Sequence, residues 1–128
     1  MTLWDRIRRW LGIEPKWLHA PRSIRPRVEA AMREAERIEG LRLNRYTADV
    51  TVQVIPAVAS QGGDPWFKGI DKPRVTGQTI RYTSGRYVVQ LAAIGGKPTL
   101  APTWAMIHEM RHVLRLSRGL HPNWRGHE

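Results

Sequence analysis

Residues 102–119 have the sequence PTWAMIHEMRHVLRLSRG. This stretch gives the strongest indication of the fold of the chain. Its apolar residues recur every three or four positions, the spacing of one face of an α-helix. Pro102 and Thr103 suit the start of such a helix, and Gly119 suits its end. We therefore predict a largely buried helix. Its apolar face comprises Trp104, Met106, Ile107, Met110, Val113, Leu114 and Leu116.

The same stretch contains His108, Glu109 and His112. Residues four positions apart lie above one another on a helix, so the two imidazoles can bind one metal ion. Glu109 projects about 100° further around the helix, where it can take a proton from an activated water and pass it to a leaving amine. Alternatively, the three are ordinary helix residues paired with neighbours. We favour a zinc site with Glu109 as its catalytic residue.

Two further helices are expected upstream. From Pro26 to Gly40 apolar residues recur at helical spacing. These residues are Val28, Ala31, Met32, Ala35 and Ile38. Residues 2–11 form a short basic amphipathic pattern that could lie on a membrane or a nucleic acid. We favour its docking on its own domain or on a partner subunit. Residues 14–26 contain three prolines and are expected to be an irregular connector.

The strands are expected between the two longer helices. Residues 49–55 alternate apolar and polar side chains, as a half-buried strand does. Residues 60–77 are rich in Gly, Pro and Asp and indicate a long surface loop. Residues 79–83 and 86–92 flank Ser84-Gly85, which predicts a hairpin with a two-residue turn. These patterns predict an α+β fold with a small twisted mixed sheet backed by two helices, plus the short N-terminal helix.

The composition limits the class of protein. A chain of 128 residues suits one ordinary domain, with 41% hydrophobic and 25% charged residues. We divide it into residues 1–25, the amphipathic helix and connector, and residues 26–128, the main domain. No apolar run approaches the roughly 20 residues that span a bilayer, and residues 1–12 do not resemble a secretory signal. We therefore expect a cytoplasmic or virion-associated protein.

Charge and cysteine content limit the ligands. Lys and Arg total 21 against 11 Asp and Glu, a net charge of +10 that favours anionic partners without naming one. Nucleic acid is possible on this ground but not specifically indicated. Cysteine is absent, so a metal must be held by nitrogen and oxygen ligands.

Several landmarks follow one another in the order found in a known family. The helix ending at Gly40 leads to Ala48-Asp49-Val50-Thr51-Val52, and 106–114, with sequence MIHEMRHVL, follows later. This arrangement resembles the matrixin-like branch of the metzincin zinc peptidases. The resemblance implies a zincin-like fold, bound Zn²⁺, and a substrate strand lying along an edge strand in the 79–92 region.

The chain departs from that family after the second histidine. The family has Gly three residues later and a third His ligand three residues beyond it, whereas this chain has Arg115 and Arg118. The methionine of the family's later turn has no obvious counterpart after Trp124. We take His121 as the third ligand, with His127 as the alternative because its longer return path reaches the site more easily. His19, in the proline-rich connector, is expected on the surface.

These observations predict a zinc-dependent endopeptidase, with His108, His112 and His121 as ligands and Glu109 as general base and acid. Its substrate would be a protein or a peptide crosslink, in a context such as a phage lysin or maturation protease. The alternative is a catalytically inactive zincin-fold protein that acts structurally in a larger, virion-type assembly through its basic surface and N-terminal helix. A nucleic-acid-binding domain ranks last.

Overall fold

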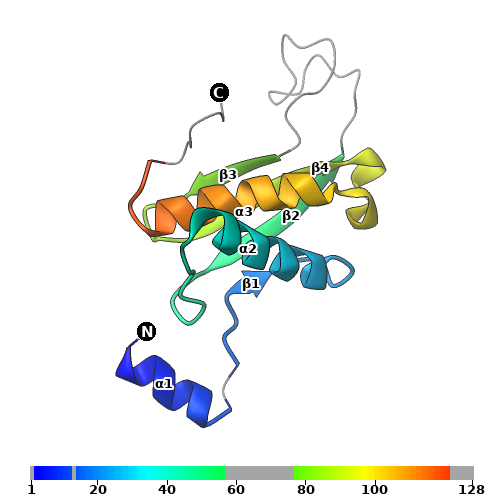
Figure 1. Ribbon diagram of the computed structural model, residues 1–128. Helices are drawn as coiled ribbons and strands as arrows, with labels where there is room; N and C mark the ends of the chain where they lie inside the picture. The colour runs from blue at the N-terminus through cyan, green and yellow to red at the C-terminus, as the bar shows by residue number, and fades with distance from the viewer. Residues whose placement is uncertain (1, 13, 57–76, 122–128) are drawn as a thin grey trace.

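The described part of the chain is an α+β fold. The computed structural model describes residues 2–12, 14–56 and 77–121. These residues form three α-helices, a four-stranded mixed sheet and two short 3₁₀ turns, Ile94–Gly96 and Pro98–Leu100 (Figure 1). Within them, no helix is long and apolar enough to cross a bilayer. The loop expected at residues 60–77 falls almost entirely outside the described residues.

The sheet is built around β4, Tyr87–Ala93. Strand β2, Val50–Pro56, runs parallel to β4, and β3, Gly77–Arg81, runs antiparallel to it along the edge. A fourth strand, β1, Leu18–His19, pairs in parallel with the outer side of β2, giving the order β1-β2-β4-β3. Six of the seven residues of β4 are buried, which suits a central strand.

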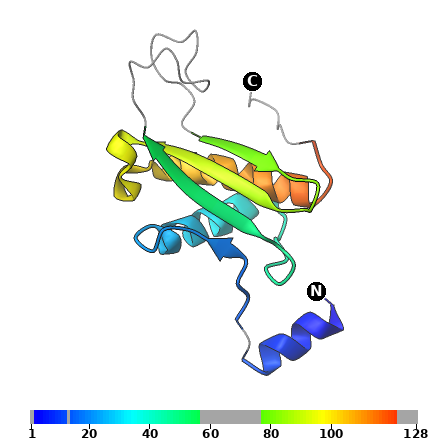
Figure 2. The ribbon, with the colours of Figure 1, turned by 180° about the vertical axis from the view of Figure 1, so that it is seen from behind.

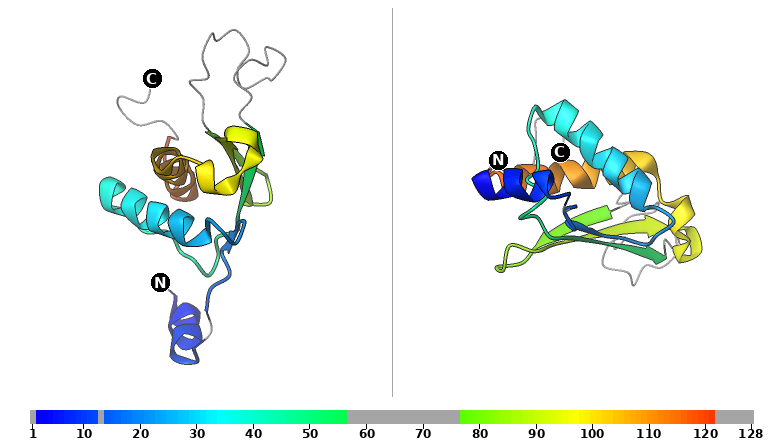
Figure 3. Two further views of the ribbon diagram at one scale, coloured as in Figure 1. Left: turned by 90° about the vertical axis from the view of Figure 1, so that its right-hand side faces the viewer. Right: turned by 90° about the horizontal axis from the view of Figure 1, so that it is seen from below.

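Two helices cover one face of this sheet. Helix α2, Arg25–Glu39, and helix α3, Thr103–Ser117, pack against one another, and Figure 3 shows both on the same side of the sheet. Seen from behind, the strands lie in front of both helices (Figure 2). Gly40 ends α2 in the left-handed conformation, at φ 66°, which glycine adopts without steric cost. The core between the layers includes Val28, Met32, Val50, Val89, Leu91, Met106, Met110, Val113 and Leu114.

The buried face of α3 is narrower than its sequence suggests. Met106, Met110, Val113 and Leu114 are fully buried, but Trp104 is 59% exposed. At about 100° per residue, Trp104 lies on the side of the helix that carries His108, away from the Met110 side. In α2, Ile38 is exposed for a different reason, since it lies in the last turn, beyond the buried residues of that helix.

Two local predictions were wrong. The 14–26 segment is not wholly irregular, because it contains β1 and contributes Trp17, Leu18 and Ile24 to the core. Two residues are too few to show an alternating pattern. The hairpin turn is also longer than two residues. Tyr82 N donates to Arg86 O (2.8 Å) and Gly85 N donates to Tyr82 O (2.9 Å), with Gly85 at φ 87°, as in a three-residue turn with a left-handed glycine.

Helix α1, Leu3–Trp10, forms where the sequence predicts it. Thr2 caps it: Asp5 N donates to Thr2 Oγ1 (3.1 Å), and Thr2 N donates to Asp5 Oδ2 (3.2 Å). Asn44 Nδ2 of the main domain also donates to Asp5 Oδ2 (3.2 Å). Asp5 is buried, while the apolar residues of α1 are largely exposed. The helix therefore contacts its own domain through its polar side, which differs from the docking of an apolar face that its pattern suggested.

Candidate metal centre

The two histidines of α3 converge as their spacing predicts. His108 Nε2 and His112 Nε2 lie 3.3 Å apart, with ring centroids 4.9 Å apart and ring planes at 73°. Two nitrogen ligands on a tetrahedral zinc ion, each about 2.0–2.1 Å from the metal, are separated by about 3.3 Å. The two imidazoles therefore already have the separation that one shared ion needs.

Glu109 completes a three-residue cluster. Its side chain is buried, at 3% exposure, and its Oε2 lies 3.9 Å from His108 Nε2. One ligand atom from each of His108, Glu109 and His112 lies within 4.8 Å of the others. Both histidines are half-buried, whereas Glu109 is buried, so its carboxyl group lies deeper than the two rings.

Strand β3 fixes the position of this carboxyl group. Thr79 Oγ1 donates a hydrogen bond to Glu109 Oε1 (2.9 Å). The other carboxyl oxygen, Oε2, lies on the side of Gly77. A Cβ atom at Gly77 would lie 2.9 Å from Glu109 Cγ and 3.1 Å from Oε2, closer than side chains normally approach. The absence of a side chain at Gly77 therefore makes room for Glu109, and Thr79 orients it.

The buried environment of Glu109 favours its protonated form. Burial raises the pKa of Glu109 to about 7, and the hydrogen bond from Thr79 only partly offsets this rise. Burial disfavours a carboxylate because it loses the hydration of its charge. A divalent cation held by the two imidazoles would act in the opposite direction and lower this pKa.

Arg115 and Arg118, the two arginines that follow His112 near the end of α3, do not block the cluster. Arg115 Nη1 lies 3.0 Å from Glu39 Oε2, and Arg111 Nε lies 2.9 Å from Glu39 Oε1. Glu39 belongs to α2, so both guanidinium groups are directed to the helix pair and share a buried acid. Arg118 lies at the C-terminal cap of α3 and donates at 3.5 Å to Arg42 O. The guanidinium group of Arg115 is thus paired with Glu39, which it shares with Arg111.

The other three histidines, His19, His121 and His127, lie outside the helix that carries the cluster or outside the described residues. His121 is exposed, and its backbone oxygen accepts a hydrogen bond from Arg115 Nε (2.8 Å). His127 lies outside the described residues. His19 is exposed, as predicted, and its Nε2 lies 3.7 Å from Asp49 Oδ1. Among the described residues, the cluster contains only His108, Glu109 and His112, so the third ligand stays a prediction.

Sequence reasoning missed the residues that support the cluster. Gly77, Thr79 and Glu39 are separated from the residues they contact by 30 to 76 positions. Gly77 is one of 11 glycines, and nothing in its immediate sequence marks it as a place of close approach. Glu39 follows a helical pattern in which an acid is unremarkable. Gly77, Thr79 and Glu39 come into contact with residues of α3 only because α3 packs against β3 and α2.

Comparisons with protein-family models, with curated proteins and with solved structures found no match to this chain.

Proposed function

We propose that the chain is a zinc-dependent endopeptidase of the zincin type. The observation that carries this proposal is the 3.3 Å separation of His108 Nε2 and His112 Nε2 beside a buried carboxyl group. His108 and His112 are two ligands, and His121 or His127 is the third. The order of sequence landmarks shared with matrixin-like metzincins supports the same function.

The residues of the cluster divide the chemistry between them. A zinc ion bound here would polarise the scissile carbonyl and acidify a water molecule. With the metal bound, Glu109 Oε2, which does not accept the Thr79 hydrogen bond, would accept the proton of that water and later deliver it to the leaving amine. Thr79 holds Oε1 by its hydrogen bond, and Oε2 lies 3.9 Å from His108 Nε2.

The sheet suggests where the substrate lies. Strand β3 is at the edge of the described sheet, with β4 on its inner side and α3 packed against it. An extended peptide can pair with an unpaired strand edge through main-chain hydrogen bonds. Within the predicted 79–92 region, β4 is the central strand and already pairs on both sides, so β3 alone can accept a substrate strand.

The proposal is tested by metal content and cleavage together. The purified chain should contain about one zinc per molecule, and alanine at His108 or His112 should abolish it. Glu109→Gln should keep the zinc but lower cleavage of a labelled protein substrate by about 10²–10⁴-fold. His19→Ala is the matched control, because it removes an exposed histidine outside the cluster. Full cleavage by Glu109→Gln would disprove the mechanism.

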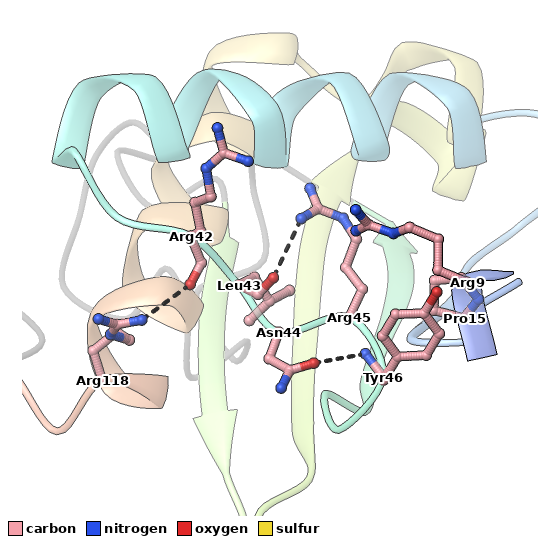
Figure 4. Close-up of a pocket in the computed structure, with 8 residues that line it drawn as sticks. All are labelled: Arg9, Pro15, Arg42, Leu43, Asn44, Arg45, Tyr46 and Arg118. Carbon is pink, nitrogen blue, oxygen red and sulfur yellow. Dashed lines mark hydrogen bonds between the residues drawn. The ribbon is translucent and has the colours of Figure 1, made fainter. Parts of the chain in front are cut away.

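A second candidate function rests on a different observation. A pocket of about 340 Å³ is lined by α1, the 42–46 segment and the end of α3, including Arg9, Arg42 and Arg118 (Figure 4). None of these three forms an ion pair with a carboxylate in the described part of the chain. This supports the alternative of an inactive zincin-fold protein that binds an acidic partner or nucleic acid within a virion-type assembly.

Metal analysis separates the two candidates. Near-stoichiometric zinc, together with loss of stability in chelator, supports the enzyme. No zinc and unchanged folding in chelator supports the structural alternative. We propose cytoplasmic or virion-associated action for either, with a phage lysin or maturation protease as the enzyme's setting.

A further inference from the structure

Helix α1 turns its apolar side away from the domain. At about 100° per residue, its apolar residues fall within a sector of about 120°. This apolar stripe consists of Leu3, Trp4, Ile7, Trp10 and Leu11. Apart from half-buried Ile7, its members are between 58% and 85% exposed. The described structure therefore leaves two tryptophans and two leucines of one short helix in contact with solvent.

The opposite side of α1 is fastened to the domain. Asp5 and Arg9 lie about 180° from the middle of the stripe. Asp5 is buried and accepts from Asn44, and Arg9 lines the pocket beside the 42–46 segment. Arg8 adds a cation-π contact with Tyr46, at 5.8 Å from the ring centroid. Because these polar contacts attach one side of α1 to the domain, the apolar stripe on the opposite side points towards solvent.

Positive charges flank the stripe on both sides. Arg6 lies about 100° from its middle on one side and Arg8 about 100° on the other. A helix with Trp and Leu on one face and arginines beside them is suited to the boundary between lipid headgroups and acyl chains. We propose that α1 binds in the plane of an anionic phospholipid membrane, with the apolar stripe buried at that boundary and exposed Arg6 against lipid phosphates. Arg8, on the other flank, stays with Asp5 and Tyr46 and adds its positive charge to the same side.

The charges around the apolar stripe favour an anionic membrane over a second copy of the chain or a nucleic acid. In a second copy of the chain, the same stripe would bring its own arginines and a net charge of +10 against the first, and like charges repel. A nucleic acid could pair its phosphates with the arginines, but contact between phosphates and the exposed leucines would not stabilise the complex. An anionic membrane satisfies both the apolar stripe and its flanks. This inference does not depend on the metal centre.

Membrane attachment through α1 would also orient the protein. Figure 1 and the left view of Figure 3 place α1 at one end of the molecule, with α3 and β3 towards the other. The elements that carry the His-Glu-His cluster would therefore be held away from the lipid surface. A protease attached in this way would act on polymers next to a membrane rather than on the membrane itself.

The test uses the whole chain and vesicle flotation. Vesicles of phosphatidylcholine are compared with vesicles that contain about 30% phosphatidylglycerol, and only the anionic vesicles should carry the protein. Trp4→Ala with Trp10→Ala should lower the partition coefficient at least about tenfold. Trp104→Ala is the matched control, since Trp104 and Trp4 are both 59% exposed, and it should change binding less than about twofold.

The outcomes are distinct. A second pair, Leu3→Ser with Leu11→Ser, should reproduce the loss, and circular dichroism should show unchanged folding because the stripe lies outside the core. Absence of binding to anionic vesicles would overturn the proposal. So would binding that survives both paired variants, because attachment would then be electrostatic only. A lipid-free dimer, or DNA binding, that depends on Trp4 and Trp10 would assign the stripe to a second copy or to nucleic acid instead.

Discussion

Helices α1 and α3 each bury one acidic residue, and the pKa values of the two residues are shifted in opposite directions. Asp5 in α1 is 2% exposed and Glu109 in α3 is 3% exposed. Burial alone would raise the pKa of Asp5, but hydrogen bonds from Thr2 and Asn44 and the charge of Arg8 outweigh it, and the pKa is lowered. Burial raises the pKa of Glu109 to about 7, because only Thr79 opposes it.

This difference separates a structural acid from a candidate catalytic one. A buried carboxylate with several donors is stabilised in its charged form and holds its helix in place. A buried carboxyl group with one donor, beside two convergent imidazoles, keeps an oxygen available for chemistry. Perturbed acids of the second kind are enriched at functional sites. The comparison therefore supports assigning α3 to the proposed reaction and α1 to the proposed attachment.

The largest expected effect concerns Glu109 in the metal-free chain. Its pKa is raised in the folded state, so between about pH 4.5 and 7 the folded chain holds a proton that the unfolded chain releases. The free energy of unfolding should therefore fall as the pH rises through this window. A shift from 4.5 to about 7 corresponds to about 3 kcal/mol. Glu109→Gln should remove this loss and make the chain more stable than the wild type at pH 8.

Urea unfolding in chelator at pH 5 and pH 8 measures this effect. The wild type should lose stability between the two pH values, and Glu109→Gln should lose about 2.5 kcal/mol less. Added zinc should reduce the difference, because a cation at the imidazoles favours the carboxylate. Parallel pH profiles for the two proteins would show that Glu109 is not held in a raised-pKa state.

The next largest effect tests the space at Gly77. Gly77→Ala should lower the free energy of unfolding by about 2 kcal/mol, because the new methyl group overlaps Glu109 Cγ at 2.9 Å. No positive φ is involved at this position, so the cost comes from packing. The same substitution should lower cleavage by moving the carboxyl group.

A double-mutant cycle identifies the clash. In a Glu109→Ala background the Cγ atom and the carboxyl group are gone, so Gly77→Ala should cost less, although Gln90 O still lies 3.1 Å from the new methyl group. Equal costs in both backgrounds would mean that Gly77 serves the strand itself and not Glu109. Urea midpoints of the four proteins provide the measurement.

These two positions also show what the sequence could and could not predict. The His108 and His112 pair followed from helical spacing, and α2, α3, β2 and the β3-β4 hairpin followed from the spacing of their apolar residues. Gly77 and Thr79 could not be found in this way, because they act on a residue about 30 positions away through strand-to-helix packing. The amphipathic pattern of α1 predicted a helix with an apolar and a polar face. It did not predict that the polar face contacts the domain, because that depends on the tertiary contact between Asp5 and Asn44.

The smallest expected effect concerns Asp5. Asp5→Ala removes the acceptor of the Thr2 and Asn44 hydrogen bonds, so α1 should fray and detach while the core stays folded. Loss of a helix cap of this kind should speed amide exchange in α1 by about fivefold, with α2 and α3 unchanged. Asp5→Asn keeps an acceptor but no charge, and it should show a smaller change.

The pH dependence at Asp5 has the opposite sign to that at Glu109. Its folded pKa is lowered from 3.8, so the stabilisation of α1 is present above that value and is lost as the pH falls below it. Amide protection in α1 should therefore decrease on acidification, whereas the metal-free core around Glu109 should become more stable as the pH is lowered from 7 towards 4.5. Protection factors measured in one sample from pH 7 to below pH 3.8 cover both windows and compare the two acids directly. If both helices responded to pH in the same direction, the contrast between a satisfied and an under-satisfied buried carboxyl group would not hold, and Glu109 would lose its main distinction from an ordinary structural acid.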